Sequence, residues 1–141
     1  MRPRSRRELE RRLLAARFEP TEVLDVLTRL ERVGLIDDEA FARQYAEQRF
    51  GARKEGSRGV ERGLRAAGIA PALAATAADG APDDDEERAA DLALSRASRL
   101  RGVPPQKAFA RLSSLLMRRG YSPEISRSAA RKALEISLLD E

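Results

Sequence analysis

The chain repeats one helical pattern three times. When the sequence is compared with itself, apolar residues recur after 51 and then 52 residues, as at Leu9, Val60 and Leu112. Each copy carries an apolar pair spaced i and i+4, a helix end, one apolar residue and a proline. The matched positions are Leu9, Leu13, Phe18 and Pro20; Val60, Leu64, Ile69 and Pro71; and Leu112, Leu116, Tyr121 and Pro123. A repeat of this length predicts stacked helical units rather than one closed bundle.

The composition favours helix along the whole chain. Hydrophobic residues make up 42% of the sequence but aromatic residues only 4%, and alanine, leucine, arginine and glutamate outnumber the β-branched residues. We therefore expect an all-α fold of tandem three-helix repeats stacked into an elongated, curved array. The offsets divide the chain into repeats at 1–50, 51–102 and 103–141. The third helix of the last repeat is expected to be missing or frayed, because the chain stops at Glu141.

Local signals predict where the helices begin and end. Ser5 and Glu8 form a capping box that opens a helix, and Pro20 opens the next one at a position where its missing N–H is not needed. The acidic run at residues 83–87 is interpreted as the end of a solvated loop that caps a helix, although it could also mimic DNA. Further caps are expected at Asp37, Asp38 and Ser57. Helix ends are expected at Arg17, Gly68 and Gly120, the two glycines being left-handed.

Missing residue types argue against catalysis. The sequence has no cysteine and no histidine, so it lacks thiolate nucleophiles, imidazole bases and the commonest metal ligands. No phosphate-binding glycine loop, GxSxG motif or metal-ligand spacing occurs. Its apolar runs are far shorter than the roughly 20 residues of a membrane span, and the N-terminus lacks an apolar signal segment. We expect a cytoplasmic protein without enzymatic activity, cofactor, metal or membrane contact.

The basic character concentrates in one segment. Arginine supplies 24 of the 27 cations, and the formal net charge is +4. The segment from Arg43 to Arg65 contains seven cationic residues and three glutamates, which gives it a local net charge of +4. Arginine forks suit phosphate and carboxylate partners, although a solvated helix face would show the same pattern. The candidate residues for binding a partner or DNA are Arg43, Arg49, Arg53, Lys54, Arg58, Arg62 and Arg65.

Two pairs of residues have a second interpretation. The aspartates at 37–38 could bind a hard cation, but capping is favoured because no further oxygen ligands stand at motif spacing. Phe41 and Tyr45 could stack on nucleic-acid bases. Burial of both rings against Leu30 and Leu35 is favoured, because the equivalent positions of the next repeat are partly apolar.

Several separated blocks resemble the RecX family of bacterial regulatory proteins. The most specific block is GLIDDEAFA at residues 34–42, followed by Tyr45 and Arg49. The other blocks are RSRREL at 4–9, EVLDVL at 22–27, GSRGV at 56–60 and LMRRGY at 116–121. Within the second repeat, Gly59 and Gly63 stand where the family has stronger helix formers. Each is expected to cost about 0.8 to 1.0 kcal/mol relative to alanine and to loosen that repeat.

The resemblance implies a non-catalytic protein that binds the RecA filament on DNA. It implies restraint of the RecA ATPase, strand-exchange and co-protease activities, and therefore regulation of homologous recombination, DNA repair and the SOS response. Weak binding to single- or double-stranded DNA and a monomeric state are expected. Two alternatives stay open: a helix-turn-helix DNA-binding regulator, which should show sequence preference, and a helical-repeat adaptor, which should ignore both DNA and recombinase.

Overall fold

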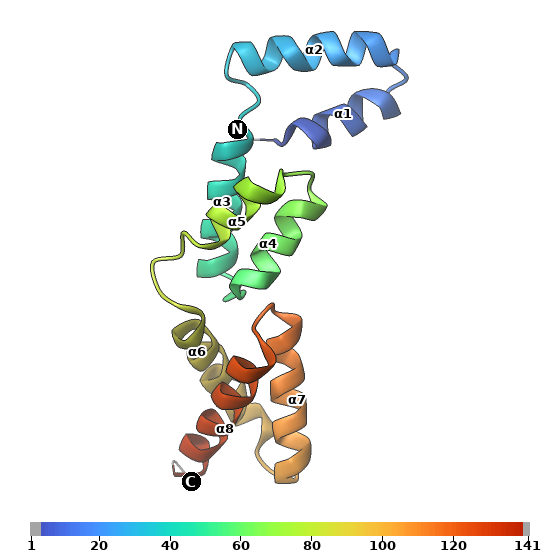
Figure 1. The fold of residues 1–141 in the computed structure, drawn as a ribbon. Coiled ribbons are helices and arrows are strands. Elements are labelled where there is room, and N and C mark those ends of the chain that lie inside the picture. Colours follow the sequence, from blue (N-terminus) through green and yellow to red (C-terminus); the bar gives the residue numbers. More distant parts are fainter. Residues whose placement is uncertain (1–3, 140–141) are drawn as a thin grey trace. The chain divides into compact units, whose positions relative to one another are not determined.

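Helices form the regular structure of the chain. The computed structural model describes residues 4–139, which contain eight α-helices, one short 3-10 helix and no strand (Figure 1). The all-α prediction is confirmed. The α-helices are α1 (Arg6–Ala15), α2 (Pro20–Arg32), α3 (Asp38–Gly51), α4 (Ser57–Ala66), α5 (Pro71–Ala78), α6 (Asp85–Ala97), α7 (Pro105–Arg118) and α8 (Pro123–Leu139), and the 3-10 helix is η1 (Ser98–Leu100). No helix within the described range is both long and apolar enough to cross a membrane.

The predicted helix ends recur with the sequence repeat. Positive φ angles occur just after α1, α4 and α7, at Arg17 (69°), Gly68 (88°) and Gly120 (97°). A proline then opens the helix that follows each of these turns, namely α2, α5 and α8. The shared plan of helix, left-handed end and proline start is therefore confirmed in all three copies.

The described chain divides into two compact units. Unit 1 comprises residues 4–47 and 61–80, and unit 2 comprises residues 48–60 and 81–139. The boundaries fall inside α3 and α4. The elongated, curved array and the repeat divisions at 1–50, 51–102 and 103–141 stay predictions.

Unit 1 has a small core and a well-capped first helix. The Ser5 hydroxyl accepts from the Glu8 amide at 3.1 Å, as the capping box predicts, and donates to the Ala67 carbonyl at 3.1 Å. Val23 and Leu27 of α2 are buried together with Ile36. The partly buried side chains that pack on them are Leu9, Leu13 and Leu30. In the turn after α2, Leu35 is 62% exposed and Ile36 takes the inner position.

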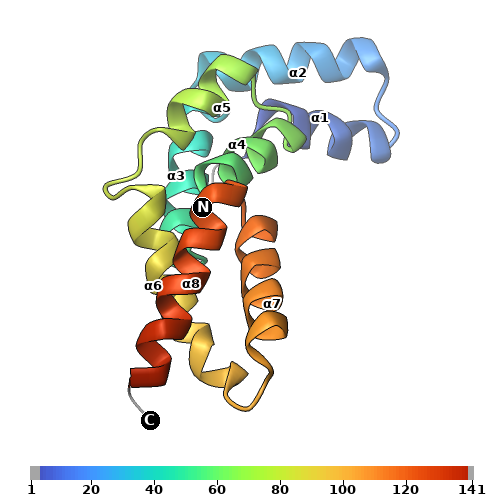
Figure 2. The ribbon, with the colours of Figure 1, turned by 60° about the horizontal axis from the view of Figure 1, so that its bottom comes forward.

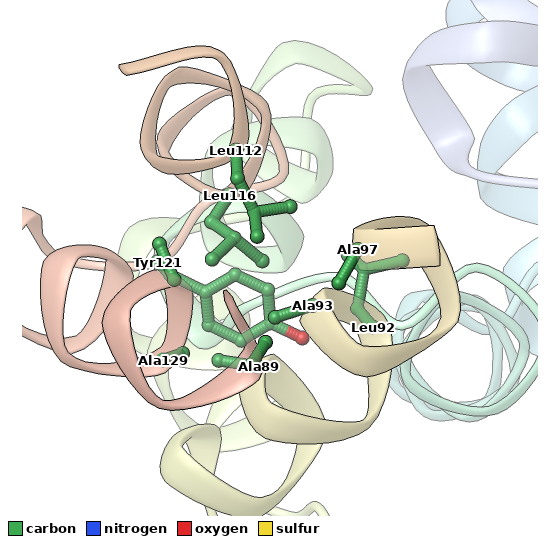
Figure 3. Close-up of a cluster of buried hydrophobic side chains, with 10 residues drawn as sticks. Ala89, Leu92, Ala93, Ala97, Leu112, Leu116, Tyr121 and Ala129 are labelled. Carbon is green, nitrogen blue, oxygen red and sulfur yellow. The ribbon is translucent and has the colours of Figure 1, made fainter. Parts of the chain in front are cut away.

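Unit 2 is built around a three-helix core. Helices α6, α7 and α8 run beside one another (Figure 2) and enclose alanine and leucine side chains around Tyr121 (Figure 3). Small residues on α6 and α8 allow the helices to approach closely, while Leu112 and Leu116 of α7 fill the remaining space. The buried cluster comprises Ala89, Leu92, Ala93, Ala97, Leu112, Leu116, Tyr121, Ala129, Ala130 and Ala133.

The glycines of α4 have a packing role that the sequence did not indicate. A Cβ atom on Gly59 would lie 2.9 Å from the Arg119 carbonyl oxygen and 3.1 Å from the Cα of Gly120. A Cβ atom on Gly63 would overlap the Tyr45 hydroxyl. The missing side chains of these glycines therefore make room for close neighbours, and the expected loosening of the second repeat stays a prediction.

Candidate partner-binding surface

Helix α4 carries three arginines away from its buried stripe. Val60 and Leu64 are completely buried, whereas the arginines are exposed. Their spacing of four and three residues keeps them on one side of the helix. The exposed set is Arg58, Arg62 and Arg65. The structure thus leaves these guanidinium groups accessible, as a surface that binds carboxylates or phosphates requires.

The start of α4 is fixed by a carboxylate from α6. Asp85 accepts from the Ser57 amide at 3.0 Å and from the Ser57 hydroxyl at 2.9 Å. The prediction that Ser57 is the N-cap is wrong: Ser57 is the first helical residue, and the Gly56 carbonyl accepts the first helical hydrogen bond, from Val60. The distant Asp85 replaces a local cap, so α6 determines where α4 begins in unit 2.

The loop between α3 and α4 is held by side chains from three other places in unit 2. The carbonyls of Arg53, Lys54 and Glu55 accept, respectively, from Arg119, Tyr121 and Arg88. In return, the Gly56 amide donates to the Arg119 carbonyl at 2.8 Å. Lys54 has a φ of 51°, a conformation that non-glycine residues seldom adopt and that the surrounding contacts must maintain. Two of the predicted cations therefore stand on an ordered loop.

Arg88 is the centre of these contacts. Only 1% of its surface is exposed, and its guanidinium lies 4.3 Å from the centre of the Phe50 ring. It donates to the Asp83 carboxylate at 2.8 Å, to the Asp83 carbonyl at 2.6 Å and to the Glu55 carbonyl at 3.2 Å, and it pairs with Asp85. A buried charge needs such partners. This role could not be predicted from the sequence, because arginine is a surface residue by default.

The acidic run before α6 is used locally. Asp84 accepts from the Glu87 amide at 2.8 Å and caps α6, as predicted. Asp83 and Asp85, which are partly exposed, form ion pairs with Arg88. The helix starts at Asp85, two residues earlier than the end of the expected loop, because Asp84 is the N-cap.

Tyr121 keeps its proton in this environment. Burial raises the pKa of the Tyr121 hydroxyl well above its ordinary value of 10.0, since the phenolate would lose its hydration, and the positive charge of Arg88 only partly opposes this. The hydroxyl is therefore a donor, which the Lys54 carbonyl requires. This bond helps to fix the loop at neutral pH.

The other predicted cations have different surroundings. Arg43 and Arg53 are exposed, whereas Arg49 pairs with Glu55 at 3.2 Å and the Lys54 ammonium lies 3.7 Å from Asp91. Arg43, Arg62 and Arg65 belong to unit 1, and the remaining four belong to unit 2. Arg53 and Lys54 line a common cavity, which two cations that were not predicted, Arg96 and Arg119, also line.

The aspartates at 37–38 and the rings of Phe41 and Tyr45 have defined contacts in unit 1. Asp37 accepts from the Ala40 amide at 3.0 Å and caps α3 as predicted. Asp38 accepts instead from the Arg6 amide at 3.0 Å, at the start of α1. Phe41 and Tyr45 stack on each other with centroids 6.1 Å apart and are half-buried. The sequence predicts burial of both rings against Leu30 and Leu35, but the rings are only half-buried and Leu35 is 62% exposed, so full burial against Leu35 is wrong.

Comparisons with known proteins agree with one another. Residues 37–77 match the model of the second three-helix domain of RecX, and residues 83–130 match that of the third. The regulatory protein RecX of Streptomyces coelicolor is 36% identical over 134 residues, which cover 94% of this chain and 71% of the relative. That of Corynebacterium efficiens is 34% identical over 145 residues, covering 99% of this chain and 69% of the relative. The two domain models group α3 to α5 and α6 to α8.

Solved structures share the fold. The crystal structure of RecX from Lactobacillus salivarius has a TM-score of 0.77 and 20% identity, and the match covers 95% of this chain and 87% of that one. A second crystal structure, of regulatory protein RecX, has a TM-score of 0.80 and 23% identity, and the match covers 92% of this chain and 64% of that one. At these identities the likeness concerns the fold alone.

Proposed function

Because this chain belongs to the RecX family of regulatory proteins, we propose that it binds the RecA filament on DNA and restrains the recombinase. The restrained activities are ATP hydrolysis, strand exchange and co-protease action. The partner comes from the family resemblance, and the manner of binding comes from the charges of this chain. The proposal includes no catalysis of its own, a cytoplasmic location and a monomeric state.

The exposed arginine face of α4 is the observation that carries the proposal. Arg58, Arg62 and Arg65 present three planar donor groups, while the opposite side of the helix is buried. A protein filament wound on DNA offers carboxylates and phosphates, and arginine binds both with paired hydrogen bonds. Contacts of this kind need no particular base sequence, as regulation of a filament on any DNA demands.

The direct test measures ATP hydrolysis by RecA assembled on single-stranded DNA. We expect addition of this protein at sub-stoichiometric doses to slow hydrolysis, because one bound copy restrains neighbouring subunits. Unchanged turnover up to equimolar protein would contradict the proposal. Binding to one duplex sequence in the absence of RecA would instead favour the helix-turn-helix regulator.

Reversing the charge of the α4 face should abolish the inhibition at the doses at which the wild-type protein acts. In the variant with Arg58→Glu, Arg62→Glu and Arg65→Glu, three attractive groups become repulsive toward phosphate and carboxylate. We expect at least a tenfold higher dose for half-maximal inhibition, or about 1.4 kcal/mol of lost binding, with unchanged helix content by circular dichroism. The assay is the same ATPase titration.

A matched control separates this face from net charge. Arg111→Glu, Arg127→Glu and Arg131→Glu also replace three exposed arginines and change the net charge from +4 to −2 in the same way. The control should keep most of the inhibition. Equal losses in both variants would show that overall charge, and not the α4 face, governs binding.

A further inference from the structure

A basic cavity in unit 2 has none of the three α4 arginines in its lining. Its volume is about 510 Å³, and its lining comes from the loop after α3, from α6 and from the end of α7. Four cationic residues from these places line it: Arg53, Lys54, Arg96 and Arg119. No sequence pattern groups these residues, because 66 positions separate the first from the last.

The charge of the cavity is poorly compensated from within. Glu55 is its single acidic lining residue among those described, and Arg49 already pairs with that carboxylate at 3.2 Å. Asp91 approaches the Lys54 ammonium at 3.7 Å, but both groups are well exposed, so this pair contributes little. A concave site lined by one sign of charge concentrates its field and favours counter-charged ligands.

The backbone that carries Arg53 and Lys54 is held in place before any ligand arrives. The Arg119 side chain donates to the Arg53 carbonyl, while the Arg119 carbonyl accepts from the Gly56 amide at 2.8 Å. The Lys54 carbonyl is tied to the buried Tyr121. These bonds already order the loop in the folded protein. Ligand binding therefore does not have to offset the conformational entropy that is lost when the loop is ordered.

We propose that this cavity binds phosphate groups of a polynucleotide backbone. Four cations suit neighbouring phosphodiesters, and the volume exceeds what one small anion needs. None of the described lining residues is aromatic, so bases have no ring to stack on and recognition is independent of base sequence. The inference deepens the proposed function, since it gives the protein a hold on the DNA beside the RecA subunits.

The test uses the full chain without RecA and a fluorescent oligo-dT probe. The variant with Arg53→Gln and Arg96→Gln removes two cations whose side chains make no hydrogen bond or ion pair with any residue between 4 and 139, and it leaves the anchoring Arg119 intact. We expect the dissociation constant for the probe to rise about tenfold or more at low salt. We also expect the slope of log affinity against log salt to fall by about 1.4, the value for two lost contacts to a single strand.

The matched control is Arg99→Gln with Arg101→Gln. These exposed arginines lie in the same unit but outside the cavity lining, and the net charge changes equally. The control should bind the probe with little change and a nearly unchanged salt slope. If the cavity variant and the control bind equally well, the cavity is not the site and the inference fails.

Competition distinguishes the source of the phosphates. Tripolyphosphate should displace the probe only at concentrations far above that of the probe, because a strand makes more contacts than a free polyphosphate. Displacement by tripolyphosphate at concentrations comparable with those of the probe would overturn the assignment to a polynucleotide and indicate a free polyphosphate as the ligand of the same cations. Slowed RecA hydrolysis by a cavity variant that binds the probe normally would overturn this inference and leave the proposed function standing. Strong probe binding by the wild-type protein without any effect on RecA hydrolysis would leave this inference standing and contradict the proposed function.

Discussion

Replacing Gly120 with alanine should destabilise unit 2 by about 3 kcal/mol or more. The φ of Gly120 is 97°, and its Cβ would overlap the Gly59 amide nitrogen and lie 2.5 Å from the Gly59 Cα and 3.1 Å from the Gly56 carbonyl oxygen. All of these atoms belong to backbone, which cannot rotate away as a side chain could. The end of α7 and the start of α4 would therefore have to separate.

The measurement can be confined to unit 2. Tyr45 and Tyr121 are the two tyrosines of the chain and no tryptophan is present, so in a Tyr45→Phe background the tyrosine fluorescence reports Tyr121. Urea unfolding followed by this signal gives the loss of stability for Gly120→Ala.

Gly102 provides the matched control for this substitution. It also has a positive φ, 82°, but a Cβ there would meet nothing within 4 Å. Gly102→Ala should therefore lose only the conformational contribution, about 1 to 2 kcal/mol. Similar losses at the two positions would contradict the close backbone contact at Gly120.

Local chemistry explains why the helix ends could be predicted. Proline at the first helical position, glycine after the last turn and a serine or aspartate cap each act within a few residues. The cap of α4 could not be found in this way, because Asp85 reaches Ser57 from 28 positions away. A repeat offset gives the period of a pattern but not its starting point. For this reason the divisions at 1–50, 51–102 and 103–141 stay predictions, while the family models group helices α3 to α5 and α6 to α8.

The candidate site could be predicted only where one helix carries it. The spacing of Arg58, Arg62 and Arg65 is enough to place them opposite Val60 and Leu64, because helical geometry is periodic. The basic cavity depends on tertiary packing, which no single segment encodes. To predict the cavity, one would have to know that the end of α7 contacts the loop before α4. The hydrogen bond from the Gly56 amide to the Arg119 carbonyl makes this contact.

Removing the buried charge at Arg88 should have the second large effect. Arg88→Met keeps much of the side-chain length but leaves Asp83, Asp85 and the Glu55 carbonyl without their common donor. Breaking a buried pair by removing one partner costs about 3 to 5 kcal/mol. Asp83 and Asp85 are partly exposed and can be hydrated in part, so we expect a loss of about 3 kcal/mol, at the low end of that range.

Arg88→Lys tests whether charge alone is sufficient. An ammonium group retains the positive charge near the Phe50 ring, but it lacks the planar fork that reaches two carboxylates and two carbonyls together. Its stability should lie between those of the wild-type protein and Arg88→Met in the same urea experiment. Arg99→Met, at an exposed position outside the cluster, should change stability by less than about 0.5 kcal/mol. Because Arg88 holds the Glu55 carbonyl, Arg88→Met should also weaken oligo-dT binding while every cation lining the cavity is still present. A fully stable Arg88→Met protein would mean that the cluster is not needed to hold the loop after α3.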